Sequence, residues 1–172
     1  MTSIKTNRLL LRELNLKDAQ QIAKIGNNKK IWENLTDAFP HPYTLQAAYD
    51  WINYNLKKTP PENFAIETEN TLIGMIGFGK KEHTLELGYW IGEEYWGKGY
   101  ATEALRAMTN YIFENYETEE ISAKVFTFNP ASGKVLEKCE YKKQPGITTT
   151  KKAGKTVNEI TYKLKRETFK KL

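Results

Sequence analysis

The segment Trp96-Gly97-Lys98-Gly99-Tyr100-Ala101 has the composition of a loop that binds phosphate. Its two glycines lack Cβ atoms, so a ligand can approach the backbone closely. Apolar residues then recur at helical spacing: Ala101, Leu105, Met108 and Ile112. A helix start offers unpaired N–H groups and a partial positive charge to phosphate oxygens, and Lys98 adds a full charge. These residue types favour a pyrophosphate cradle and an ordinary strand-to-helix turn equally.

A nucleoside triphosphate loop is a competing interpretation of the same segment. The run from Gly92 to Gly99 differs by one residue from the pattern G-x-x-x-x-G-K-[ST]. Gly99 stands where that pattern needs a hydroxyl group to hold magnesium, and Glu93 and Glu94 would lie inside a loop that surrounds anionic phosphates. We therefore reject the triphosphatase interpretation.

Composition indicates one globular domain over residues 1–172, with 40% hydrophobic residues. We expect a cytoplasmic protein, because the sequence contains neither an apolar run long enough to span a membrane nor a signal-peptide core. One cysteine, Cys139, and two histidines without ligand spacing make a metal site unexpected. Residues from Lys142 onward carry ten Lys and Arg against two Glu. Without alternating aromatic residues, this basic end predicts a frayed tail at 165–172 and no dedicated nucleic-acid site.

Periodicity, caps and breakers predict an α+β layout in which strands and helices follow one another without a repeat. Helices are expected at 18–26, 30–34, 45–56, 101–116 and 131–139. Strands are expected at 8–13, 64–68, 72–78, 85–91, 121–128, 141–143 and 157–164, and a mobile loop is expected at 146–155.

The loop from Trp96 to Ala101 resembles the acetyl-CoA loop of GNAT acetyltransferases, Q/R-x-x-G-x-G/A. Gly99 and Ala101 fill its small positions, whereas Trp96 replaces the usual Gln or Arg. The wider run G-Y-W-I…W-G-K-G-Y-A-T-E-A-L is similar to the RimJ/RimL branch, which acetylates protein N-termini. The resemblance implies a mixed, mostly antiparallel sheet with helices on both faces. It also implies a splay between strands 85–91 and 121–128 that admits the pantetheine arm.

The same resemblance implies acetyl-CoA as the donor and assigns the residues that hold it. The diphosphate would bind the loop at Gly97, Lys98, Gly99, Tyr100, Ala101 and Thr102. The strand edge at Trp90 and Ile91 would pair with pantetheine through free backbone groups. Asn129 would contact the cofactor arm while also capping the following helix.

Proton transfer is assigned by the same resemblance to two residues. Glu86, opposite Leu85 and Leu87 on its strand, is the candidate base that neutralises the amine, with a solvent-facing carboxylate as the equal alternative. Ser132 is the candidate donor to the departing thiolate, with an ordinary early-helix serine as its alternative. Tyr141 is a second candidate donor, although a core position suits it better, and Cys139 is expected to be a buried, inert thiol.

The acceptor is expected to contact the aromatic loop that contains Trp32, Phe39 and Tyr43, although Tyr43 also suits a position covering the sheet. Asp37 of the same loop and the segments 74–79 and 146–155 are further candidates for contact with the acceptor. The resulting hypothesis is direct acetyl transfer to a primary amine, with a protein N-terminal amine, such as that of a ribosomal protein, as the best match. A small amine of the polyamine or aminoglycoside type and a non-catalytic acyl-CoA-binding domain stay open, as does the choice between monomer and homodimer.

Overall fold

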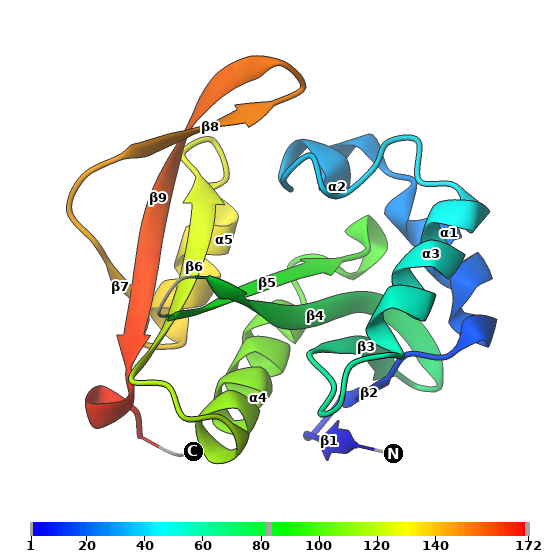
Figure 1. Cartoon of the computed structure of the whole chain (residues 1–172), viewed down its shortest axis with the longest axis horizontal. Coiled ribbons are helices and arrows are strands. Elements are labelled where there is room, and N and C mark those ends of the chain that lie inside the picture. Colours follow the sequence, from blue (N-terminus) through cyan, green and yellow to red (C-terminus); the bar gives the residue numbers. More distant parts are fainter. Residues whose placement is uncertain (1, 82–83, 171–172) are drawn as a thin grey trace.

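The computed structural model describes residues 2–81 and 84–170, which form a mixed nine-stranded sheet flanked by helices (Figure 1). The strand order is β1-β2-β3-β4-β5-β6-β9-β7, and β8 pairs with β9. The strands are β1 Ser3–Lys5, β2 Leu10–Glu13, β3 Asn63–Thr68, β4 Thr71–Lys81, β5 Thr84–Ile91, β6 Glu120–Phe126, β7 Lys142–Lys143, β8 Thr148–Lys152 and β9 Lys155–Lys165. The α-helices are α1 Ala19–Gly26, α2 Lys29–Glu33, α3 Leu45–Asn55, α4 Tyr100–Asn115 and α5 Pro130–Lys138.

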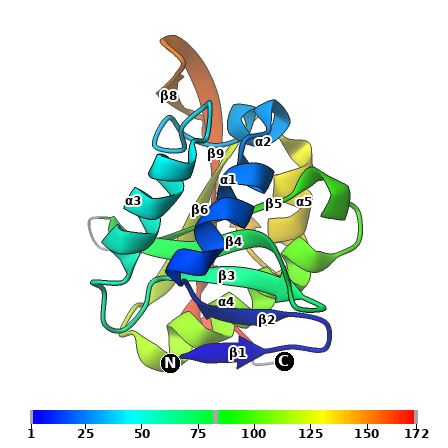
Figure 2. The ribbon, with the colours of Figure 1, turned by 90° about the vertical axis from the view of Figure 1, so that its right-hand side faces the viewer.

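Two apolar clusters place helices on both faces of the sheet. One cluster joins α1 and α3 to residues such as Ala65 and Met75. The other joins α4 and α5 to residues such as Phe64 and Leu87. Figures 1 and 2 show α1 and α3 separated from α4 by the strands. The expected α+β architecture, with a mostly antiparallel sheet, is therefore confirmed.

The sheet divides between β5 and β6, its parallel neighbours. These strands pair at Leu85↔Ile121 and Glu86↔Ser122. Beyond those pairs β5 continues to Ile91 and β6 to Phe126, without further register between them. The diverging segment, which we call the split, agrees with the splay implied by the family resemblance.

The segment 146–155, expected to be a mobile loop, instead contributes to a hairpin, so this prediction is wrong. Strands β8 and β9 pair from Thr148↔Glu159 to Lys152↔Lys155. Ala153 and Gly154 make the turn with φ angles of +49° and +77°. Threonine and lysine side chains occupy both faces of β8, so no hydrophobic alternation was available to indicate a strand.

The basic C-terminal segment is held by contacts as far as Phe169, in contrast to the frayed tail expected at 165–172. Lys165 ends β9, and the Arg166 guanidinium donates to the carbonyl groups of Phe113, Tyr116 and Thr118 at 2.7–2.9 Å. The ring of Phe169 packs 5.0 Å from that of Phe113. Hydrogen bonds to carbonyl groups at and just after the end of α4 therefore hold this segment, and residues 171–172 lie outside the described residues.

Two glycines of β4 offer a matched test of how closely β4 and β5 approach. A Cβ atom at Gly74 would lie 2.2 Å from the backbone oxygen of Trp90, whereas one at Gly79 meets nothing within 4 Å. We expect Gly74→Ala to lower the free energy of unfolding by about 3 kcal/mol, because backbone must move. Gly79→Ala should leave it unchanged or raise it by up to about 1 kcal/mol. Urea unfolding measures both, and equal losses would contradict the close approach at Gly74.

Candidate active site

The loop between β5 and α4 has the backbone geometry of an anion cradle. Gly97 and Gly99 adopt φ angles of +74° and +82°, in the left-handed region that glycine favours. Gly99 is the N-cap of α4, where no side chain caps the helix. The first intrahelical bond runs from Glu103 N–H to Gly99 C=O at 3.1 Å. The earlier N–H groups, those of Tyr100–Thr102, therefore remain available to a ligand at the positive end of the helix.

Trp96, the residue that departs from the family loop pattern, fastens the loop to β5. Its indole Nε1–H donates to the Ile91 carbonyl at 2.6 Å. Next to it, the Lys98 ammonium lies 5.4 Å from the centroid of the Tyr95 ring, and the Lys98 side chain is exposed. The Trp96 hydrogen bond thus attaches the start of the loop to the end of β5, and Lys98 adds an exposed cation to the loop.

Backbone alternation along β5 decides which residues have main-chain groups at the split. The N–H of Gly92 donates to Ile73 in β4 at 2.8 Å. Because backbone groups alternate sides along a strand, those of Trp90 also point to β4, and those of Tyr89 and Ile91 point to the split. The expectation of free backbone groups at Trp90 is therefore wrong, and Tyr89 takes its place. The Ile91 carbonyl is occupied by Trp96, which leaves the Ile91 N–H for a ligand.

The start of α5 and the side chain of Tyr89 bring two hydroxyl groups together. The Asn129 Oδ1 caps α5 by accepting the backbone N–H of Ser132 at 3.2 Å, so its amide nitrogen keeps donors for another partner. The Ser132 Oγ lies 2.9 Å from the Tyr89 hydroxyl. Burial raises the pKa of Tyr89 to about 12, so this phenol stays protonated at neutral pH. The sequence prediction named Ser132 and missed Tyr89; the alternation of β5 places Tyr89 among residues packed against the core.

Glu86 lies half-buried on the other face of β5, where α1 and α3 pack. Its cross-strand partners are Gly79 in β4 and Ser122 in β6. A Cβ atom at Gly79, or at Gly88 further along β5, would meet nothing within 4 Å, so the space beside the carboxylate is open. Glu86 and Ser132 are therefore presented on opposite faces of the sheet, on either side of the β5 edge.

The three predicted acceptor residues occupy different surroundings. Phe39 contacts the rings of Tyr43 and Trp90, at centroid distances of 4.7 and 5.7 Å, so these rings form one group. Tyr43 is 5% exposed and belongs to the core beneath α1 and α3. Trp32 stands apart and stacks on His41 at 5.2 Å. Phe39 and the indole of Trp90 thus form an aromatic contact on the face of the sheet that α1 and α3 cover.

The tip of the β8–β9 hairpin reaches this aromatic loop. The buried Lys152 ammonium lies 3.2 Å from Asp37 Oδ1 and 3.9 Å from the centroid of the Trp32 ring. The Ala153 N–H donates to the Asp37 carboxylate at 2.9 Å. Figure 1 shows the hairpin extending toward the segment around α2. Asp37 and the hairpin, both expected from the sequence to contact the acceptor, therefore lie together.

Cys139 and Tyr141 are both engaged in the core. Burial raises the pKa of the Cys139 thiol to about 11, and its Sγ donates to the Thr102 carbonyl at 3.5 Å. The Tyr141 hydroxyl lies 2.9 Å from Thr109 Oγ1, and Tyr141 is 1% exposed. These positions suit an inert thiol and a packed aromatic ring.

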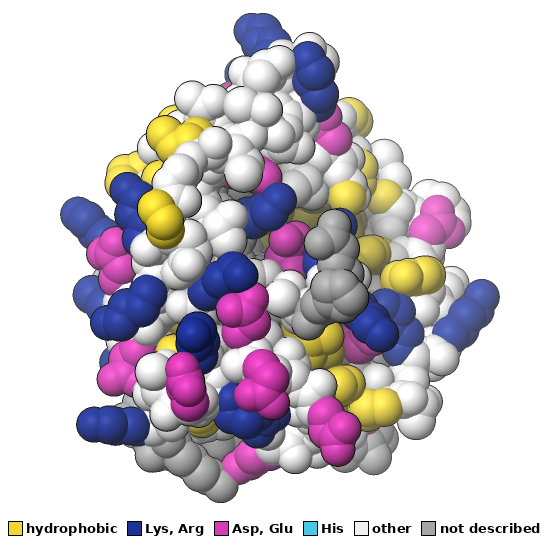
Figure 3. Space-filling model, turned by 60° about the vertical axis from the view of Figure 1, so that its left-hand side comes forward, with side chains coloured by type: hydrophobic (Ala, Val, Ile, Leu, Met, Phe, Trp, Pro, Cys, Tyr) yellow, Lys and Arg dark blue, Asp and Glu magenta, His cyan; other side chains and the backbone are white. Residues whose placement is uncertain are grey.

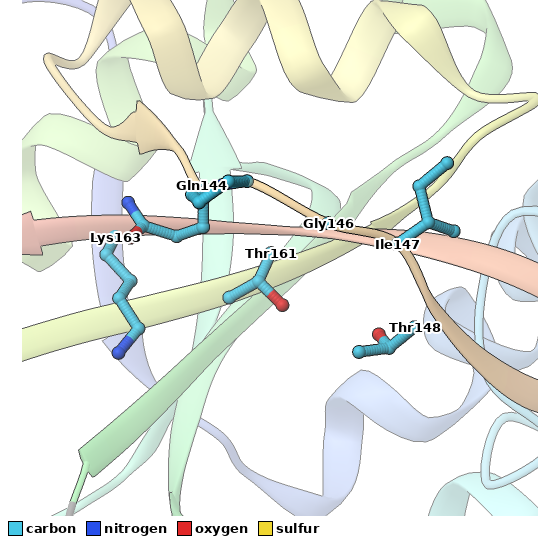
Figure 4. A pocket seen from close by; sticks show the side chains of 7 residues that line it. Gln144, Gly146, Ile147, Thr148, Thr161 and Lys163 are labelled. Atoms are coloured by element: carbon cyan, nitrogen blue, oxygen red, sulfur yellow. The ribbon is translucent and has the colours of Figure 1, made fainter.

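A cavity of about 370 Å³ lies beside β9 (Figure 4). Thr161 and Lys163 of β9 line it together with the segment 144–148. The Lys163 ammonium is paired with Glu120 at 2.6 Å. Figure 3 likewise shows Lys and Arg interspersed with Asp and Glu on this side of the molecule, without a field of one sign. None of the candidate cofactor-binding or catalytic residues lines this cavity.

Residues 8–142 match the family described as Acetyltransferase (GNAT) domain, so the chain belongs to the GNAT family and is an N-acetyltransferase. A relative from Escherichia coli, the [Ribosomal protein uS5]-alanine N-acetyltransferase, is 29% identical over 82% of this chain and 78% of its own. A GNAT-family acetyltransferase from Bacillus anthracis superposes with a TM-score of 0.84 at 27% identity, covering 96% and 99% of the two chains. RimL, the ribosomal L7/L12 α-N-protein acetyltransferase in complex with coenzyme A, superposes with a TM-score of 0.81 at 17% identity, covering 95% and 98%.

Among the described residues, no helix is long and apolar enough to cross a membrane.

Proposed function

We propose that this N-acetyltransferase uses acetyl-CoA to acetylate a primary amine, in particular the N-terminal amine of a protein. The uncapped start of α4, preceded by two left-handed glycines and adjoining the split, carries the proposal. It is supported by the Escherichia coli relative, which acts on an alanine of a ribosomal protein, and by RimL, which binds coenzyme A.

Two parts of the site would bind acetyl-CoA: the loop before α4 and the split between β5 and β6. The N–H groups of residues 97–102 and the Lys98 ammonium would hold the diphosphate. The backbone of Tyr89 and the N–H of Ile91 would pair with the amides of pantetheine, as an added strand pairs with a sheet edge. The side-chain nitrogen of Asn129 would donate to the same arm.

Acetyl transfer then needs three proton movements, two away from the nitrogen and one to the sulfur. The acceptor nitrogen attacks the thioester carbonyl carbon, a C–N bond forms and the C–S bond breaks. Glu86 would accept the ammonium proton, directly or through water, before the attack. The Ser132–Tyr89 hydroxyl pair would supply a proton to the departing sulfur, with Ser132 as the donor and the neutral Tyr89 phenol orienting it. The nitrogen would lose its second proton as the adduct collapses, and that proton, carried by water, would restore the Ser132 hydroxyl. No acyl-enzyme is required.

Replacing Tyr89 by Phe is expected to lower kcat about tenfold with little change in the KM for acetyl-CoA. The reason is that Ser132 loses the hydroxyl group that orients it at 2.9 Å. Tyr141→Phe is the matched control, because it removes another buried tyrosine hydroxyl from a pair with Thr109. Thiol release measured over a range of acetyl-CoA concentrations separates kcat from KM. An equal fall in kcat for both variants would contradict the role of Tyr89.

The acceptor class is tested with three substrates of different chemistry: a peptide with a free N-terminus, the same peptide with a blocked N-terminus and one lysine, and a polyamine. Thiol release and mass spectrometry identify the modified amine. We expect modification of the free N-terminus. Modification of the polyamine alone would establish the small-amine alternative, and coenzyme A binding without thiol release would indicate a domain that binds acyl-CoA without turnover.

A further inference from the structure

Arg8, in the segment between β1 and β2, contacts the phosphate loop from a distant part of the chain. Its Nη1 donates to the Lys98 carbonyl at 2.9 Å, and its Nε donates to Glu103 Oε2 at 2.7 Å. The Arg8 backbone N–H donates to the other oxygen of Glu103 at 2.9 Å. The guanidinium also lies over the Tyr100 ring, 4.7 Å from its centroid. One side chain therefore contacts the loop, the first helical residue and the first-turn carboxylate.

Glu103 would oppose an anionic ligand if it stood alone. It lies in the first turn of α4, close to the N–H groups that face the proposed diphosphate. Burial alone would raise its pKa, but hydrogen bonds from Thr6 and Arg8 outweigh burial and hold the pKa below its ordinary value. The carboxylate is therefore ionised at neutral pH, and Arg8 is the cation that compensates it.

The bond to the Lys98 carbonyl also sets the direction of the next N–H group. In a trans peptide the C=O and the following N–H point in opposite directions. Because Lys98 C=O points to Arg8, the Gly99 N–H points away from Arg8 and outward from the loop. Of the five guanidinium N–H groups, three are directed at Glu103 and Lys98. Two remain on a side chain that is 48% exposed.

We propose that Arg8 is part of the diphosphate-binding site, where it cancels the charge of Glu103, fixes the Lys98–Gly99 peptide and donates its two remaining N–H groups to a phosphate. This inference rests on the proposed use of acetyl-CoA. It extends the site from the loop to a side chain 90 residues earlier in the sequence.

The test compares Arg8→Ala, Glu103→Gln and the double variant by calorimetric titration with coenzyme A and with pantetheine, which lacks the diphosphate. Arg8→Ala should weaken coenzyme A binding at least tenfold, about the effect of losing one hydrogen bond to a charged group, and leave pantetheine binding unchanged. The double variant should recover part of the loss, because the uncompensated carboxylate is gone. A purely structural role for Arg8 predicts neither the dependence on diphosphate nor the rescue.

Lys57→Ala is the control for net charge, since it removes one exposed cation after α3. Thermal unfolding of each variant without ligand reports whether the fold is retained. Unchanged coenzyme A affinity in a folded Arg8→Ala protein, or equal losses for coenzyme A and pantetheine, would overturn the role of Arg8. Absence of coenzyme A binding by the unmodified protein would instead overturn the proposed function on which it rests.

Discussion

Replacing Gly99 by Asp is expected to weaken coenzyme A binding at least about a hundredfold while the protein stays folded. The new carboxylate would stand at the N-cap of α4, among the N–H groups proposed for the diphosphate. A Cβ atom there lies 3.3 Å from Arg8 Nη2, so the carboxylate would also compete with phosphate for that guanidinium. Calorimetric titration with coenzyme A gives the affinity, and thermal unfolding confirms that the fold persists.

Gly99→Asn separates charge from shape in this experiment. Asparagine has nearly the size of aspartate and is similarly tolerant of the φ of +82° at this position, but it is neutral. We therefore expect the Asn variant to bind much more tightly than the Asp variant. Equal affinities in the two variants would show that backbone strain is responsible, and an Asp variant that binds as well as the unmodified protein would place the phosphates elsewhere.

Glu86→Gln is expected to lower kcat/KM about a hundredfold at pH 7, the scale on which a positioned general base acts. The loss should shrink as the pH rises above about 8, because α-amino groups deprotonate without assistance in that range. The measurement is a pH profile of thiol release with a peptide acceptor, recorded for both proteins.

An exposed carboxylate provides the comparison for Glu86. Glu94 follows β5 and is exposed, so Glu94→Gln changes the net charge by the same amount. Its pH profile should match that of the unmodified protein. A Glu86→Gln profile that parallels the unmodified one at every pH would remove Glu86 from the reaction and leave it as a strand carboxylate beside an open space.

The phosphate loop could be predicted from sequence because its signals are local. Gly97, Gly99 and the apolar spacing after Ala101 lie within a few residues of one another, and the conformation they require depends on backbone sterics. The order of strands and helices was likewise predictable, since caps and periodicity act over short segments. The same reasoning failed for β8, whose polar faces carry no period, and for β1, which is three residues long.

The remaining parts of the site depend on contacts between distant segments. The pairing of Tyr89 with Ser132 follows from the orientation of α5 against β5, which no short pattern encodes. The direction of the Trp90 backbone depends on register with β4, and a shift of one residue reverses it. Arg8 and Glu103 are 95 positions apart and meet only once the sheet and α4 have packed.

The contact between Asp37 and the β8–β9 hairpin joins the two portions of the sheet at one end of the split. At the opposite end they are joined by the short pairing of β5 with β6 at Leu85 and Glu86. Rocking of one portion against the other about the β5–β6 pairing would have to break the contact between Asp37 and the hairpin. Exchange of the Ala153 amide proton with solvent deuterium therefore reports that motion, because the hydrogen bond to Asp37 slows the exchange while the contact holds.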